Sequence, residues 1–216
     1  FREPLYVGML VRTLGIGLAV GALVVVISFP LAYFLTRTTS RWKGALIALA
    51  LSPLLASVVV RTYGWFVILS RGGVLNDVLM AAGLIDDRLQ LIPGVLAMTV
   101  GLTHVLLPYG VFTIMSSLEG VSPTLELAAM NLGASRVQTF LRVVLPLSLP
   151  GLAGGFLLTF AITISAYATP AMLGGPRSET MATQIYSFMV TILDWSMGAT
   201  FGALLIGTTL VLLFSA

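Results

Sequence analysis

The sequence predicts an all-α, polytopic membrane protein, and three observations support this fold class. Of its 216 residues, 58% are hydrophobic and only 9% are charged, whereas a soluble domain usually carries about 25% charged residues. Five apolar runs each reach the roughly 17 to 25 residues that a helix needs to cross a bilayer. The runs are continuously apolar, which favours helices over the alternating strands of a membrane barrel.

The five runs define five predicted spans within one transmembrane domain that covers residues 1–216. The spans are expected at about 12–36, 44–69, 90–117, 146–170 and 195–216. The first begins at Arg12 and ends before Arg37, the second carries Arg61 as its only charge, and the other three carry none. Short connecting segments hold nearly all of the remaining charge. Prolines lie inside four of the runs, where each can kink or break a helix: Pro30, Pro53, Pro108 and Pro150.

The composition argues against several classes of function. The net charge is +3, but the basic residues are scattered, so no nucleic-acid partner is expected. Cysteine is absent, which removes thiolate metal ligands and a thiol nucleophile, and we expect neither a metal site nor a catalytic residue. The phosphate-binding pattern G-x-x-x-x-G-K-[ST] is absent too, so ATP is expected to bind elsewhere and the chain is not expected to be an enzyme.

The loop at 119–145 has the signals of two short helices. Ser122 can cap the first helix, and Gly133 can adopt the left-handed conformation that ends it. Apolar residues recur between them at helical spacing, namely Leu125, Ala128, Ala129 and Leu132. Ser135 can cap a second helix, which we expect Pro146 to end. Small alanines on one face would let a partner approach closely, as in a helix that docks into a groove.

This loop resembles the EAA loop of binding-protein-dependent ABC importer permeases of the type I, methionine-permease-like class. The pattern of that family is E-A-A, three residues, Gly, nine residues, and Ile-x-Leu-Pro. Six positions stand at matching spacings, namely Ala128, Ala129, Gly133, Val143, Leu145 and Pro146. The glutamate of the family would fall at Leu127, whereas Glu126 stands one residue earlier. We therefore expect the strongest polar contact of the motif to be shifted or lost.

The resemblance implies a bacterial inner-membrane permease in contact with lipid, with the 119–145 loop in the cytoplasm. Its implied partners are ATPase subunits that bind ATP and Mg, a second permease subunit and an extracytoplasmic substrate-binding protein. Six helices are typical of that family, so we expect a sixth helix before Phe1. The expected ATPase-coupling residues are Pro123, Leu125, Glu126, Ala128, Ala129, Leu132, Gly133, Ala134, Arg136, Leu145 and Pro146.

Other stretches resemble the spermidine/putrescine permease branch, at 52–76, 107–111, 168–175 and the pair Asp194 and Trp195. This resemblance implies the inward movement of a small polar solute, a polyamine or a similar amine or amino-acid derivative. Candidates for the substrate path are the polar and aromatic residues His104, Tyr109, Ser165, Tyr167 and Thr169. Residues expected at the outer face or against the binding protein are Arg61, Tyr63, Trp65, Asp194 and Trp195.

Several alternatives remain open at the level of sequence. His104 can instead form a hydrogen bond between helices, and the tyrosines can be interfacial anchors. A secondary transporter or a channel without an ATPase partner would also be polytopic and lack a nucleotide site. Ion coupling usually depends on ionisable residues at mid-membrane, where only His104 lies. A scaffold that transports nothing would not need the helix-glycine-helix loop.

Overall fold

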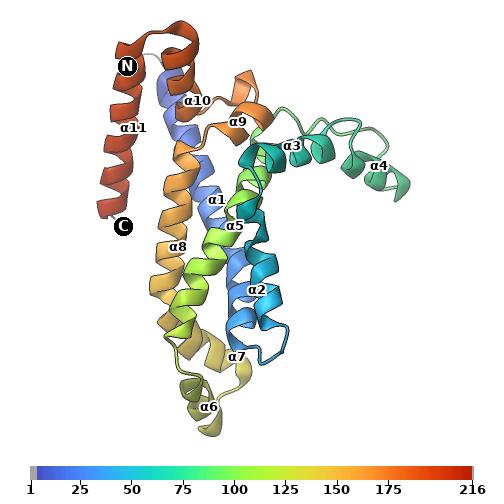
Figure 1. Cartoon of the computed structure of the whole chain (residues 1–216), viewed down its shortest axis with the longest axis vertical. Helices are drawn as coiled ribbons and strands as arrows, with labels where there is room; N and C mark the ends of the chain where they lie inside the picture. Colours follow the sequence, from blue (N-terminus) through green and yellow to red (C-terminus); the bar gives the residue numbers. More distant parts are fainter. Residues whose placement is uncertain (1–3, 216) are drawn as a thin grey trace. The chain divides into compact units, whose positions relative to one another are not determined.

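The computed structural model describes residues 4–215, and it contains helices but no strand within this range (Figure 1). Residues 1–3 and 216, at the ends of the predicted domain, lie outside the described residues. Five of the described helical segments are long and apolar enough to cross a membrane, namely Tyr6–Arg37, Val58–Ala81, Val95–Glu119, Arg136–Ser165 and Trp195–Leu212. The predicted all-α, polytopic fold class is confirmed.

Most of the helices and short helical turns follow one another closely, and the longest irregular segment within the described residues is 82–94, between α4 and α5. In chain order they are α1 (Pro4–Arg37), α2 (Lys43–Leu51), η1 (Ser52–Leu55), α3 (Val58–Leu69), α4 (Val74–Ala81), α5 (Val95–Glu119), α6 (Pro123–Asn131), α7 (Arg136–Thr139), η2 (Phe140–Val144), α8 (Leu145–Ser165), α9 (Ala168–Leu173), η3 (Pro176–Ser178), α10 (Met181–Tyr186), η4 (Ser187–Ile192) and α11 (Trp195–Ser215). The chain forms two compact units. Unit 1 comprises Phe1–Val20, Ala56–Val105 and Phe160–Ala216, and unit 2 comprises Gly21–Leu55 and Leu106–Thr159.

Unit 2 has an apolar core to which α1, α5 and η2 contribute. Its buried residues include Phe29, Leu35, Ile114, Leu118 and Val144. Gly110 of α5 lies so close to α1 that a Cβ there would collide with Val24 and Ser28. Gly151 of α8 lies equally close to Ser117 of α5. Small residues allow such close helix packing in a membrane, where lipid is as apolar as the side chains.

Unit 1 packs its C-terminal helices against the beginning of α1. Their shared core consists of Met9, Met181, Phe188, Phe201 and Leu205. Thr13 in α1 strengthens this packing, because its Oγ1 accepts a hydrogen bond of 2.9 Å from the backbone N–H of Met181. Elsewhere in the unit, Thr62 of α3 and Thr169 of α9 share a buried hydrogen bond of 2.9 Å.

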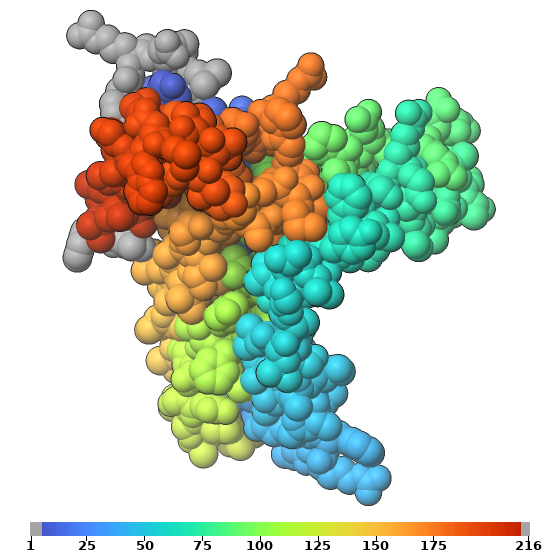
Figure 2. Space-filling model, turned by 45° about the horizontal axis from the view of Figure 1, so that its top comes forward, coloured from blue at the N-terminus to red at the C-terminus, as the bar shows by residue number. Residues whose placement is uncertain are grey.

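Residues 70–94 form a lobe of unit 1 that is seen in teal and green in Figure 2. Asn76, which is fully buried, holds this lobe together. Its Nδ2 donates to the carbonyl oxygens of Ser70 (3.2 Å) and Leu89 (3.0 Å), and its Oδ1 accepts from the N–H of Leu89 at 2.8 Å. A single amide therefore pairs backbone groups on both sides of α4.

The run predicted as one span at 44–69 forms two helices instead. The turn η1 contains Pro53, which has no N–H to continue α2, and Ser57 then adopts an extended conformation with ψ 138°. No residue of α2 is buried. Helices α1, α5 and α8 continue through their own prolines, which membrane helices tolerate more readily than soluble ones.

The run predicted at 146–170 also divides, because α8 ends at Ser165 and α9 begins at Ala168. Pro170 lies in the first turn of α9, where its missing N–H is tolerated, but it could not continue α8. Helix α5 begins only at Val95, five residues after the expected start at 90, since Pro93 and Gly94 precede it.

Candidate functional site

Helix α6 is built from local signals in the 119–145 loop. The side chain of Ser122 accepts a hydrogen bond from the N–H of Thr124 at 3.3 Å, and Pro123 occupies the first turn. The helix ends before Gly133, whose φ of +91° is a left-handed conformation that suits glycine. The N–H of Ala134 then closes the end by donating to the carbonyl oxygen of Ala129 at 3.1 Å. The expected helix and glycine bend are both present.

The second helix of the loop starts as expected but does not stop where expected. Ser135 and Gln138 form a capping box, with the N–H of Ser135 donating to Oε1 of Gln138 at 2.9 Å. The prediction that Pro146 ends this helix is wrong, because the chain passes from α7 through the π-helical turn η2 into α8. The N–H of Leu145 donates to the carbonyl oxygen of Phe140, five residues back. Pro146 thus enters in the first turn of α8, where a proline costs little.

The surface of α6 is apolar and exposed. Leu125 is 47% exposed and Leu132, at the end of the helix, is 90% exposed. Both lie on one face with Ala128 and Ala129, since residues three and four apart share a helix face. No residue of α6 is buried. Its position in unit 2 therefore depends on polar contacts and not on a packed core.

Glu126 supplies those polar contacts from another face of α6. One carboxylate oxygen of Glu126 lies 2.7 Å from Nη2 of Arg37 and accepts a hydrogen bond of 2.8 Å from its Nε. The other oxygen accepts from the hydroxyl of Tyr33 at 2.8 Å. The Arg37 Nη2 also donates to the carbonyl oxygen of Val121 at 2.9 Å. Only 18% of the Arg37 side chain and 14% of the Glu126 side chain is exposed, so the pair ties α6 to the last turn of α1 with little competition from water.

Neither Tyr33 nor Arg37 was among the predicted site residues. Arg37 looked like a charge that ends a span, and a pairing across 89 positions leaves no periodic signal. The predicted residues from Pro123 to Arg136 do gather in α6 and α7 of unit 2 (Figure 1). Leu145 packs against the core of unit 2, and Pro146 is exposed at the start of α8.

The five predicted substrate-path residues are divided between the two units. Tyr109 belongs to unit 2 and the other four belong to unit 1. The Ser165 hydroxyl donates within its own helix to the carbonyl oxygen of Ala161 at 3.1 Å, while Thr169 is engaged with Thr62. His104 packs edge-on against Trp65, with ring centroids 5.6 Å apart. Tyr167 and Ser165 each line a cavity, but the two cavities have different lining residues.

The five predicted outer-face residues, all in unit 1, have mixed roles. Arg61 reaches α5 and donates from Nη1 to the carbonyl oxygen of Val105 at 3.2 Å. Asp194 caps α11, since its Oδ1 accepts from the N–H of Met197 at 3.0 Å. Tyr63, stacked on a phenylalanine of its own helix, and Trp195 are exposed. Trp65 packs against His104 as described above. Only Tyr63 and Trp195 therefore present large aromatic surfaces.

Curated relatives of this chain are membrane permeases. The spermidine/putrescine transport system permease protein PotB of Escherichia coli K12 is 32% identical over 197 residues, which cover 91% of this chain and 72% of that protein. PotB of Haemophilus influenzae is 27% identical over 210 residues and 97% of this chain, and 72% of its own length is covered. A probable molybdenum ABC transporter permease of Haloferax volcanii is 35% identical over 170 residues, or 76% of this chain and 58% of the relative.

Solved structures share the fold at lower sequence identity. A bacterial alginate ABC transporter in complex with an alginate-bound periplasmic protein matches 98% of this chain and 76% of its own with a TM-score of 0.80 and 17% identity. The inward-facing MetNI methionine ABC transporter matches 100% of this chain and 95% of its own with a TM-score of 0.73 and 20% identity. These likenesses support the fold.

The family model described as "Binding-protein-dependent transport system inner membrane component" matches residues 14–216. The match takes in the 119–145 loop with α6 and its glycine bend, as well as every span from α3 to α11. The resemblance that the loop indicated thus extends over nearly the whole sequence. The chain is a multi-pass inner-membrane protein and belongs to the family of binding-protein-dependent transport system inner membrane components.

Proposed function

We propose that this chain is the permease subunit of an ATP-driven importer and that α6 couples it to a separate ATPase subunit. ATP and Mg bind to that ATPase, while a second permease subunit and an extracytoplasmic substrate-binding protein complete the importer. Family membership supports this assembly, as does the similarity in fold to solved ABC transporters.

The observation that carries the coupling role is the exposed apolar face of α6. Leu125 projects from a nine-residue helix that has no buried residue, and Leu132 projects from the residue that follows it. A short helix with exposed apolar side chains can insert into a groove of a partner, where those side chains are removed from water. Because Glu126 fixes another face of α6 to α1, the apolar face of Leu125 and Leu132 stays free for the ATPase.

The contacts of α6 also provide a path for movement. Closure of the ATPase displaces α6, the ion pair transmits the displacement to the last turn of α1, and the unbroken chain through η2 transmits it to the start of α8. ATP binding then shifts the equilibrium between the inward-open and outward-open arrangements of the spans, as expected of a two-state transporter.

The proposed cargo is a polyamine or a similar amine or amino-acid derivative. Support comes from the similarity to spermidine/putrescine permeases over 91% of the chain. The alternative is a secondary transporter or channel that needs no ATPase. Uptake that depends on ATP hydrolysis and survives collapse of ion gradients would distinguish the importer from this alternative.

The test replaces Leu132 by aspartate and asks whether the ATPase still copurifies. We expect Leu132→Asp to reduce the amount of bound ATPase and ATP-driven uptake by about tenfold or more, because a central contact of an interface contributes at least ~2 kcal/mol. Leu84→Asp is the matched control, since Leu84 is 71% exposed in the lobe of unit 1. Undiminished copurification and uptake with Leu132→Asp would refute the coupling role.

A further inference from the structure

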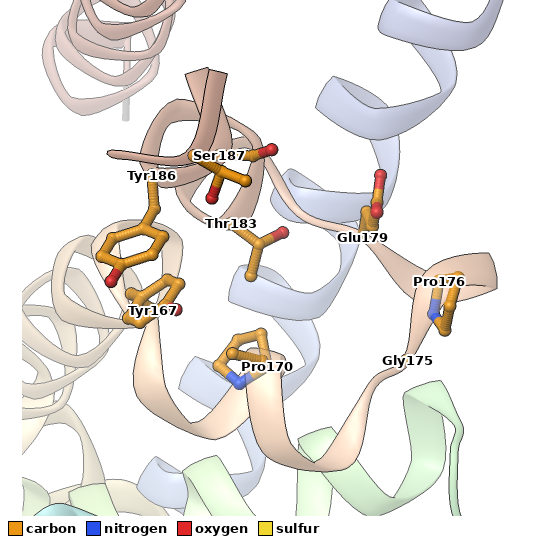
Figure 3. A pocket seen from close by; sticks show the side chains of 10 residues that line it. Tyr167, Pro170, Gly175, Pro176, Glu179, Thr183, Tyr186 and Ser187 are labelled. Atoms are coloured by element: carbon orange, nitrogen blue, oxygen red, sulfur yellow. The ribbon is translucent and has the colours of Figure 1, made fainter. Parts of the chain in front are cut away.

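A cavity in unit 1 brings together two tyrosines and a carboxylate (Figure 3). It measures about 330 Å³ and lies among α9, η3, α10 and η4, at the lower end of the size range of small-molecule pockets, about 300 to 1,000 Å³. The polar side chains that line it are Tyr167, Glu179, Thr183, Tyr186, Ser187 and Thr191. Figure 3 shows Tyr167 and Tyr186 together on one side and Glu179 on the other, with Thr183 between them.

The two tyrosines form a stacked pair. Their ring centroids are 4.1 Å apart with an interplanar angle of 23°, and both side chains remain partly exposed. Desolvation and the neighbouring Tyr186 raise the pKa of the Tyr167 phenol, which is uncharged at neutral pH even at its ordinary value. The face of a neutral tyrosine ring attracts cations. Within the described residues no arginine or lysine lies over either ring.

Glu179 is partly buried, and its carboxylate has no ion-pair partner in the part of the chain that the structure describes. Arg12 comes near it but donates from Nη1 to the backbone carbonyl oxygen of Glu179, at 3.3 Å. A partly buried carboxylate without a charged partner can pair with a cationic ligand through charge-assisted hydrogen bonds. The cavity therefore favours a positively charged ligand.

We propose that this cavity binds the primary ammonium group of an alkyl amine, which is a subsite for the cargo. Glu179 accepts hydrogen bonds from the ammonium group, Thr183 and Ser187 offer further acceptors, and the alkyl chain or a second ammonium group lies against the tyrosine rings. The role in transport depends on the permease function proposed above. One crossing, α8, separates residues 119–144 from residues 166–194, so a cytoplasmic 119–145 loop implies that the cavity opens to the outer side.

Binding of radiolabelled putrescine to the purified full chain in lipid nanodiscs tests the subsite without any binding protein. We expect the wild-type chain to bind the diamine but not the neutral diol of the same length. Glu179→Gln and Tyr186→Leu should each weaken binding by about tenfold, as expected for a lost charge-assisted hydrogen bond and a lost cation–π contact. Tyr186→Phe keeps the ring and should bind within about twofold of wild type.

Asp86→Asn is the matched control, because it removes an exposed carboxylate elsewhere in unit 1. Each variant is first checked by its thermal transition, and if Glu179→Gln does not fold, the comparison of Tyr186→Leu with Tyr186→Phe carries the test. Absence of binding to the wild-type chain, or equal binding by Tyr186→Leu and Tyr186→Phe, would overturn the proposal. Equal binding by folded Glu179→Gln and wild type would do so as well.

ATP-driven uptake by the complete importer separates this inference from the proposed function. Binding without ATP-driven uptake would refute the importer and leave the ammonium site intact. Uptake at an undiminished rate with Glu179→Gln would show that the cavity is not a cargo subsite, while the importer function stands. Reduced uptake in both Glu179→Gln and Tyr186→Leu, with normal copurification of the ATPase, supports both.

Discussion

The Glu126→Gln variant should release α6 from unit 2. Glutamine preserves the length of the side chain and one acceptor oxygen, but it loses the charge that pairs with Arg37 at 2.7 Å and the second oxygen that accepts from Tyr33 at 2.8 Å. We expect α6 to open more often, while the core around Phe29 and Ile114 stays intact, since neither residue depends on the ion pair.

The expected increase in the opening of α6 follows from the contacts that hold this helix. A helix of fewer than about 12 to 15 residues is marginal on its own in water, and α6 has nine residues with none buried. A hydrogen bond to a charged group contributes about 1.5 to 3 kcal/mol. Because glutamine retains part of the bonding, we expect a loss of about 2 kcal/mol, which corresponds to an opening equilibrium raised about 30-fold.

Hydrogen exchange of the α6 amides in the purified chain measures this opening directly. The control is Asp77→Asn, which breaks the ion pair between Asp77 and Arg88, whose side chains are 56% and 42% exposed. Exposed pairs contribute about 0 to 1 kcal/mol, so exchange in α4 should rise less than about fivefold. The reasoning is refuted if exchange in α6 is unchanged, or if the effects of Glu126→Gln and Arg37→Gln add to within about 0.5 kcal/mol.

Three further substitutions test the backbone and the helix packing. At the Gly133 φ of +91°, alanine should cost about 1 to 2 kcal/mol in backbone strain. Gly133→Ala should therefore weaken ATPase copurification more than Gly133→Asn does, and equal copurification would contradict this. Gly110→Ala should lower the free energy of unfolding in detergent by about 1 to 3 kcal/mol through overpacking against α1, whereas Gly207→Ala, which points into open space, should not. Thr62→Val should lower the free energy of unfolding by about 0.6 kcal/mol in the same assay. The double variant Thr62→Val with Thr169→Val should be no less stable than Thr169→Val alone, because the two hydroxyls share one bond. Full additivity of the two effects would exclude that bond.

The features that sequence reasoning predicted are those with local causes. The spans follow from apolar runs, and α6 follows from Ser122, Pro123 and Gly133, each of which acts within one helical turn of its own position. The break at 52–57 was harder to foresee. Pro53 looks the same in sequence as Pro30 or Pro108. What separates them is burial, because Phe29 and Leu106 beside those two prolines are buried, whereas no residue of α2 is.

Sequence reasoning failed where partners lie far apart in the chain. Arg37 and Glu126 pair across 89 positions, and Tyr167 stacks on Tyr186 only because the chain turns between α9 and α10. The substrate-path candidates were chosen because polar side chains are rare in apolar spans. Ser165 shows why this criterion is weak, since its hydroxyl is satisfied by carbonyl oxygens of its own helix. Polarity within a span indicates a hydrogen bond, and that bond is often local.

The one-residue shift of the glutamate has a consequence for the partner. Successive residues on a helix point about 100° apart, so a carboxylate at Glu126 can face α1, whereas Leu127 faces outward and is exposed. The acidic group that the family pattern places at Leu127 is therefore used here inside the permease, to fix α6 to α1. Leu127 points away from the face formed by Leu125, Ala128, Ala129 and Leu132, so it gives α6 a second exposed apolar surface. The part of the proposed ATPase groove that meets Leu127 should therefore be apolar, because an arginine or lysine left unpaired against a leucine would be destabilising.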